Sequence, residues 1–65
     1  MKLGIQERRC LKAALNVVMA FENSDLIEAA KFQAMCDRLQ QQFKDIPSKF
    51  IRAAIEFYCE YKRLI

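Results

Sequence analysis

The chain has 65 residues, a formal net charge of +3, three cysteines and no histidine. A domain of this length buries only about 60% of the surface that its unfolded chain exposes, so such chains often gain stability from disulfides, metals or association. An odd number of cysteines without a Cys-x-x-Cys pair, together with the lack of histidine, argues against a disulfide framework and a zinc site. We expect one small domain with buried free thiols, no metal and no cofactor.

The charge is unevenly spread along the chain. Residues 1–21 carry four basic and one acidic side chain, residues 22–45 three basic and five acidic, and residues 46–65 four basic and two acidic. A nucleic-acid-binding domain usually concentrates more positive charge on one face. No apolar run approaches the roughly 20 residues of a membrane span, and the first five residues lack the long apolar segment of a signal peptide. The sequence therefore predicts a soluble, cytoplasmic protein with no membrane association.

A single glycine and a single proline leave little room for turns, and no segment alternates strictly between polar and apolar residues. These features predict an all-α chain. The first helix is predicted over residues 6–21, where apolar residues recur at spacings of three and four. They form two adjoining rows, Cys10, Ala14, Val17 and Phe21 in one and Leu11, Leu15 and Val18 in the other.

A polar cluster at residues 22–25 separates this helix from a second one, predicted over residues 25–44. Ser24 and Asp25 are favoured N-cap residues, and Glu28 completes a capping pattern with Asp25. The main apolar seam of the second helix consists of Ala29, Phe32, Cys36, Leu39, Phe43 and Ile46. A second face, rich in small residues, contains Ile27, Ala30 and Ala34 and is expected to hold a closely packed helix. The glutamines at positions 40–42 are expected to form an exposed turn of helix.

A third helix is predicted over residues 47–63, because Pro47 suits the first turn of a helix. The residue before a proline avoids helical angles, so Ile46 is expected to be extended and buried. The third helix has two adjoining apolar faces, Phe50, Ala54, Phe57, Tyr61 and Leu64 on one and Ile51, Ala54, Tyr58, Tyr61 and Ile65 on the other. A helix so widely apolar belongs in a large core or under a second chain, and a chain of this length cannot form a large core.

These patterns predict a three-helix unit completed by oligomerisation. The first two helices are expected to form an antiparallel hairpin, with the second as the central helix and the third crossing both. Phe57 and Tyr58 are about 100° apart around a helix, so the aromatic residues of the third helix cannot all face inward. The residues predicted to contact a partner are Val17, Phe21, Phe57, Tyr58, Tyr61 and Ile65.

The sequence offers little for catalysis. Without histidine, a Ser–His or Cys–His nucleophile pair cannot be built, and one glycine is too few for a phosphate-binding loop. Glu56 and Glu60 share a helix face, but Arg52 lies one turn before Glu56, which predicts a surface ion-pair ladder. We do not expect an enzyme.

DNA binding is the alternative function. The segment Asp45–Arg52 resembles the turn of helix-turn-helix repressors and activators, with Ile46, Pro47 and Ile51 at matching positions. It departs from that pattern at Asp45, where the turn usually has glycine. The resemblance implies a transcriptional regulator with a degenerate helix-turn-helix motif. The residues available for nucleic-acid contacts are Arg8, Arg9, Lys12, Lys49 and Arg52.

The favoured function is a non-enzymatic protein-interaction module. An apolar excess on short helices is typical of a surface that a partner covers, and aromatic residues with a polar tip are enriched at protein interfaces. We expect a homodimer or a complex with another protein, acting as an adaptor, inhibitor or regulator. Small size and the lack of catalytic groups fit bacterial or phage regulators of this kind.

Overall fold

The computed structural model describes residues 4–64, with side chains for residues 4–62. Within this range the chain forms three helices, α1 (Ile5–Ala20), α2 (Glu28–Gln42) and α3 (Ser48–Leu64), which pack against one another. The all-α, three-helix prediction is therefore confirmed. The bounds of the first and third helices agree with the predicted ones to within one residue.

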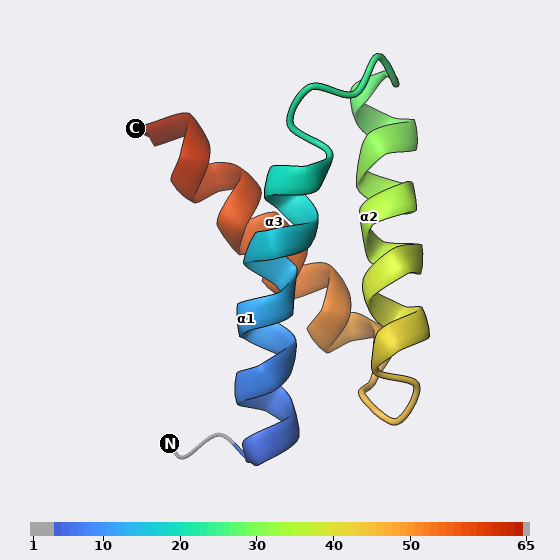
Figure 1. Ribbon diagram of the computed structural model, residues 1–65, viewed down its shortest axis with the longest axis vertical. Helices are drawn as coiled ribbons and strands as arrows, with labels where there is room; N and C mark the ends of the chain where they lie inside the picture. The colour runs from blue at the N-terminus through green and yellow to red at the C-terminus, as the bar shows by residue number, and fades with distance from the viewer. Residues whose placement is uncertain (1–3, 65) are drawn as a thin grey trace.

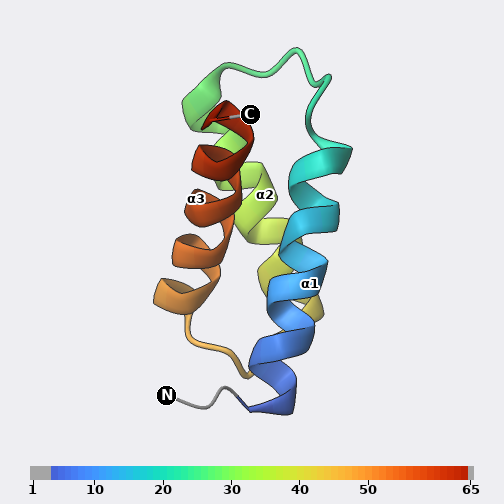
Figure 2. The same cartoon turned by 90° about the vertical axis from the view of Figure 1, so that its left-hand side faces the viewer.

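The three helices run up, down and up. In Figure 1, α1 and α2 lie antiparallel and α3 crosses behind them at an angle, while Figure 2 shows α1 and α3 running in the same direction. The predicted hairpin and crossing helix are both present. The expectation that the second helix is central is wrong, because the most extensive packing is between α1 and α3, and the least is between α1 and α2.

The core is formed by one side of each helix and by the corner between α2 and α3. Its buried residues are Cys10, Ala14, Val17 and Val18 from α1, Met35, Cys36 and Leu39 from α2, Ile46, and Ile51, Ala54 and Ile55 from α3. The predicted seams contain most of them. Met35 and Ile55 were not assigned to any seam, although Phe32, Met35 and Leu39 follow the same three- and four-residue spacing.

The second helix begins later than predicted. Ser24 does not cap it, because the Ser24 hydroxyl accepts a hydrogen bond from the Leu26 backbone N–H within the loop (3.2 Å). Short hydroxyl side chains often bond to nearby backbone in this way, in competition with helix formation. The N-cap position is Ile27 with extended backbone (φ −64°, ψ 156°), and Glu28 is the first helical residue.

This late start leaves the predicted small-residue face of α2 uncovered. The side chain of Ile27 is 74% exposed and that of Ala30 is also exposed, whereas Ala34 is half-buried. The expectation that another helix packs closely on this face is therefore wrong within this chain.

The corner between α2 and α3 is closed by a glutamine side chain. The Gln40 Nε2 group donates hydrogen bonds to the carbonyl oxygens of Phe43 (2.9 Å) and Ile46 (2.8 Å). Gln40 is half-buried, so only Gln41 and Gln42 match the predicted exposed turn. Ile46 is buried as predicted, and the glutamine fixes the backbone on both sides of the turn that carries it into the core.

Candidate protein-interaction surfaces

The outer face of α3 carries two large exposed aromatic side chains. Phe57 is 60% exposed and Tyr61 is 52% exposed, and they lie one helical turn apart on the same face. Tyr58 packs partly against the core and meets the Phe57 ring edge-on, with 5.1 Å between ring centroids and 76° between ring planes. The Tyr58 ring is therefore half-buried against the core, whereas the Phe57 and Tyr61 rings are exposed. We call Phe57 and Tyr61 the α3 aromatic face.

The other predicted partner residues have different positions. Val17 is only 4% exposed and belongs to the core, so its assignment to an interface is corrected: its row on α1 faces the other helices of this chain. Phe21 is half-buried, with the Arg38 guanidinium 5.6 Å from its ring centroid. Ile65 lies outside the described residues.

Four further large apolar side chains are exposed, and none of them was among the residues predicted to contact a partner. They are Ile5, Met19, Leu26 and Ile27. Ile5 and Met19 belong to neither apolar row predicted for the first helix. Their position outside these rows could have predicted their exposure. Leu26 and Ile27 are exposed because they lie in the loop before the late start of α2.

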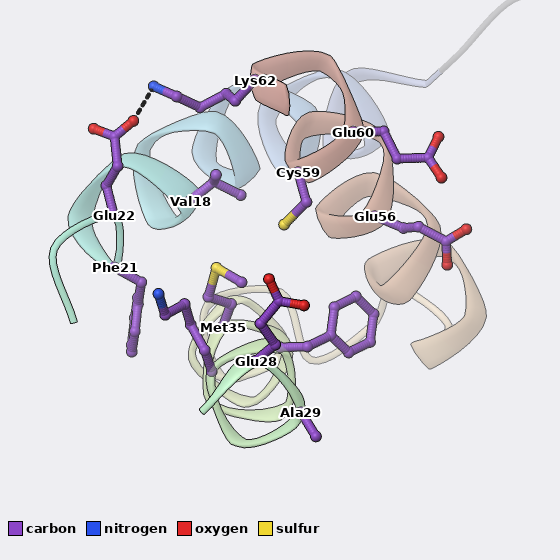
Figure 3. A pocket seen from close by; sticks show the side chains of 12 residues that line it. Val18, Phe21, Glu22, Glu28, Ala29, Met35, Glu56, Cys59, Glu60 and Lys62 are labelled. Atoms are coloured by element: carbon purple, nitrogen blue, oxygen red, sulfur yellow. Dashed lines mark ion pairs between the residues drawn. The ribbon is translucent and has the colours of Figure 1, made fainter. Parts of the chain in front are cut away.

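A pocket of about 650 Å³ opens between the C-terminal halves of α1 and α3 and the N-terminal half of α2. Figure 3 shows the Cys59 and Met35 sulfur atoms turned toward the hollow from opposite sides. We call it the end pocket. Its lining residues are Val18, Phe21, Glu22, Glu28, Ala29, Lys31, Phe32, Met35, Glu56, Cys59, Glu60 and Lys62.

The end pocket combines an apolar lining with an excess of negative charge. Four carboxylates line it against two ammonium groups, and one pair, Lys62 and Glu22, forms an ion pair of 2.6 Å between the ends of α3 and α1. Glu56 and Glu60 line the α3 edge of the pocket, and Figure 3 shows their carboxylates directed outward from this edge, away from the hollow. The pocket therefore suits a group that is apolar at its centre and positively charged at its edge.

The predicted ion-pair ladder on α3 does not form in the described part of the chain. The Arg52 guanidinium lies instead 6.0 Å from the ring centroid of Phe32 on α2. Glu56 is thereby left facing solvent at the pocket edge, without its predicted partner.

None of the three cysteines forms a disulfide, and their surroundings are unequal. Cys10 and Cys36 are buried, and burial is the largest factor that raises the pKa of each thiol above its ordinary value of 9.0. Nearby Glu7 raises the pKa of Cys10 further, and Arg52 partly offsets the rise for Cys36. Cys59 is half-buried and lines the end pocket, so it differs from the buried thiols expected from the sequence.

The basic residues predicted for nucleic-acid contacts are all exposed. They are Arg8, Arg9 and Lys12 on α1 and Lys49 and Arg52 on α3. All lie in the N-terminal halves of their helices, which start at the same end of the bundle (Figure 2). The corner that resembles a helix-turn-helix turn has no residue at positive φ, the conformation for which glycine is favoured, and the Gln40 side chain supports it instead.

In residues 4–64, no cluster of three or more cysteine or acidic side chains has the arrangement of a metal site. None of the helices in that range combines the length and the apolar character needed to cross a membrane. Comparison with known proteins found no matching family model, no matching curated protein and no matching solved structure. Function must therefore be inferred from the surfaces of the chain itself.

Proposed function

We propose that this chain is a small, non-enzymatic protein-interaction module that binds a partner protein, another copy of itself, or both. The observation that carries the proposal is the α3 aromatic face, where Phe57 and Tyr61 are exposed on a helix whose Ile51 and Ile55 are buried in the core. Tyrosine and phenylalanine are enriched at the centres of protein interfaces. The proposed role is that of an adaptor, inhibitor or regulator that acts by covering a partner's surface.

The energetics set a minimum size for such an interface. Full burial of one large apolar side chain contributes about 1.5–3 kcal/mol, so two contribute at most about 6 kcal/mol. Association costs roughly 4–15 kcal/mol in lost translational and rotational freedom. Phe57 and Tyr61 alone are therefore insufficient for tight binding, and the partner must cover further surface around them.

The proposal is tested by removing the exposed rings without touching the core. The double variant Phe57→Ser/Tyr61→Ser is compared with the unchanged chain by light scattering over a wide concentration range and by co-purification from the native cell. A control variant, Ile27→Ser, removes an apolar side chain elsewhere that is more exposed than either ring. We expect the native chain and the control to associate and the double variant not to associate.

A contrary result is equally clear. If the native chain has the monomer mass at every concentration, has a melting temperature independent of concentration and retains no partner, the proposal is wrong.

A second candidate function is nucleic-acid binding, favoured by the position of all five predicted basic side chains near one end of the bundle. Binding to phosphates releases counterions, so the affinity would fall steeply between about 50 and 200 mM salt. Titration of labelled DNA at several salt concentrations tests this function. An affinity unchanged in Arg8→Ala/Arg9→Ala and in Lys49→Ala/Arg52→Ala would exclude it.

A further inference from the structure

We propose that the end pocket binds a basic amphipathic helix of a partner protein, with apolar side chains in the hollow and lysine or arginine residues at its acidic edge. This inference rests on the proposed function and specifies the partner's chemistry. It concerns a surface different from the α3 aromatic face. Glu56 and Phe57 are about 100° apart around α3, so the two surfaces lie on different flanks of that helix.

The shape of the end pocket fits a helix. The C-terminal half of α3 diverges from the N-terminal half of α2, as Figure 1 shows, and the pocket lies where these two helices separate. Its volume of about 650 Å³ exceeds what a single side chain fills. An added helix between α2 and α3 would contribute several apolar side chains from one face, which is a common mode of peptide recognition.

The apolar character of the lining provides the driving force. Val18 and Met35 are buried core residues that also reach the pocket, and Phe21 and Phe32 border it from α1 and α2. Methionine and aromatic side chains adapt well to apolar partners. A ligand in this pocket would therefore extend the hydrophobic core of the chain.

The charge of the lining selects the partner. Four glutamates and two lysines line the pocket, and Lys62 forms an ion pair with Glu22. Positive charges on a bound helix would meet Glu56 and Glu60, whereas an acidic helix would be repelled. Complementary charge at an interface edge determines which partners bind and how fast they associate.

A second copy of this chain is the competing occupant, because α1 carries exposed Arg8, Arg9 and Lys12. Those residues lie in the half of α1 away from the pocket. A contact between them and the pocket of another copy would be head-to-tail, and such contacts close only into rings or continue as filaments. A helix from a different protein fits the pocket without that requirement.

The test uses a synthetic amphipathic peptide of about 18 residues, long enough to be helical, with leucine and one tryptophan on its apolar face and lysine on its polar face. The chain itself has no tryptophan, so the fluorescence reports only the peptide. A matched peptide has glutamate in place of every lysine. Each peptide is titrated with the full chain and with the variant Glu56→Lys/Glu60→Lys.

A control variant separates local from overall electrostatics. Asp37→Lys/Asp45→Lys changes the net charge by the same amount at exposed positions outside the pocket. We expect the lysine peptide to bind the native chain and the control with similar affinity. Glu56→Lys/Glu60→Lys should weaken its binding by about tenfold or more. The glutamate peptide should bind the native chain at least about tenfold more weakly than the lysine peptide.

A second measurement locates the peptide. Cys59 lines the pocket, whereas Cys10 and Cys36 are buried. Alkylation of the native chain, followed by peptide mapping, should show slower modification of Cys59 when the lysine peptide is bound.

Three results would overturn the inference. The first is equal weakening by the pocket variant and the control, which means attraction to overall charge. The second is unchanged Cys59 alkylation in the bound state. The third is absence of peptide binding. If, in that case, the chain self-associates and Glu56→Lys/Glu60→Lys makes it monomeric, the pocket is assigned to a second copy of the chain.

A parallel titration distinguishes failure of this inference from failure of the proposed function. The variant Phe57→Ser/Tyr61→Ser is titrated in parallel and should bind the lysine peptide like the native chain. If the peptide fails to bind while the native chain still associates through Phe57 and Tyr61, the end-pocket inference fails and the proposed function stands. If the peptide binds and the chain shows no association through those rings, the end-pocket inference stands and the proposed function of the aromatic face fails.

Discussion

Gln40 and Ile46 are joined across the corner between α2 and α3 by a hydrogen bond of 2.8 Å from the glutamine Nε2 to the isoleucine carbonyl oxygen. The same amide nitrogen also donates to the Phe43 carbonyl oxygen. One side chain on the last turn of α2 therefore fixes the path of the chain into α3. This corner leads directly into α3, the helix that carries the aromatic face and lines the end pocket.

Replacing Gln40 with alanine should destabilise the chain. The Phe43 carbonyl oxygen still accepts a hydrogen bond from the Ile46 backbone N–H (3.2 Å), but the part-buried Ile46 carbonyl loses its side-chain donor, and leaving one such group unsatisfied costs about 1–3 kcal/mol. We expect a decrease of about 1–3 kcal/mol in the free energy of unfolding, measured by urea denaturation. Gln41→Ala, at an exposed neighbouring position, is the control and should change it by less than about 0.5 kcal/mol. Equal effects of the two substitutions would show that the corner does not depend on the amide.

Leu39 should be among the most sensitive core positions. It is fully buried among residues of all three helices, so Leu39→Ala removes apolar contacts and leaves a cavity. Such substitutions cost about 2–5 kcal/mol, a large part of the stability of a chain of this size. Thermal unfolding followed by circular dichroism should show a much lower midpoint. Leu26→Ala, at an exposed loop position, should leave the midpoint nearly unchanged.

The aromatic face should contribute little to folding. Phe57 and Tyr61 are both more than half exposed, so Phe57→Ser/Tyr61→Ser should lower the unfolding free energy of the dilute monomer by no more than about 1 kcal/mol. Urea denaturation at low protein concentration measures this value. A loss as large as that of Leu39→Ala would mean that these rings support the fold, and a loss of association in this variant would then have a different cause.

The thiols should react at different rates. Cys59 is half-buried, whereas Cys10 and Cys36 are buried and have raised pKa values, so they form less of the reactive thiolate. With a thiol-specific reagent at neutral pH, Cys59 should be modified first. The other two thiols should react only as the chain unfolds. Peptide mapping by mass spectrometry identifies the order, and rapid labelling of Cys10 or Cys36 in the folded chain would contradict the structure.

The raised thiol pKa values also imply a pH dependence of stability. A thiol whose pKa is higher in the folded than in the unfolded chain favours folding while it stays protonated. Its contribution is therefore complete below the ordinary value of 9.0 and is lost as the pH rises through 9.0 toward the folded pKa. We expect the unfolding free energy to decrease from neutral pH to about pH 10. The decrease should be smaller in Cys10→Ala/Cys36→Ala, and an identical decrease would exclude the thiols as its cause.

Periodicity predicted the parts of the fold that depend on local sequence. The bounds of α1 and α3, the burial of Cys10, Ala14 and Leu39, and the buried Ile46 before Pro47 agree with the structure. The beginning of α2 was not predictable in this way. Ser24 has the chemistry of an N-cap, but its hydroxyl bonds within the loop, and nothing in the local sequence decides between these two partners.

The candidate surfaces were predictable only in part. Adjoining apolar rows on the third helix indicated an apolar excess, but they did not show which residues would be spare. The structure orients α3 with Ile51 and Ile55 inward, and this places Phe57 and Tyr61 outward with Tyr58 between core and surface. Val17 was predicted to contact a partner but is a core residue, because a buried row and an exposed row have the same spacing.

The apolar excess, the three helical segments and the uneven distribution of charge were determined by the sequence itself, because periodicity, capping chemistry and composition are local properties. The position of the end pocket was decided only by tertiary structure. It forms where Glu22, Glu28 and Glu56 come together from separate elements, and the crossing angle of α3 depends on packing among all three helices. A surface assembled from distant segments depends on that packing. The spacing of apolar residues within one segment therefore cannot predict it.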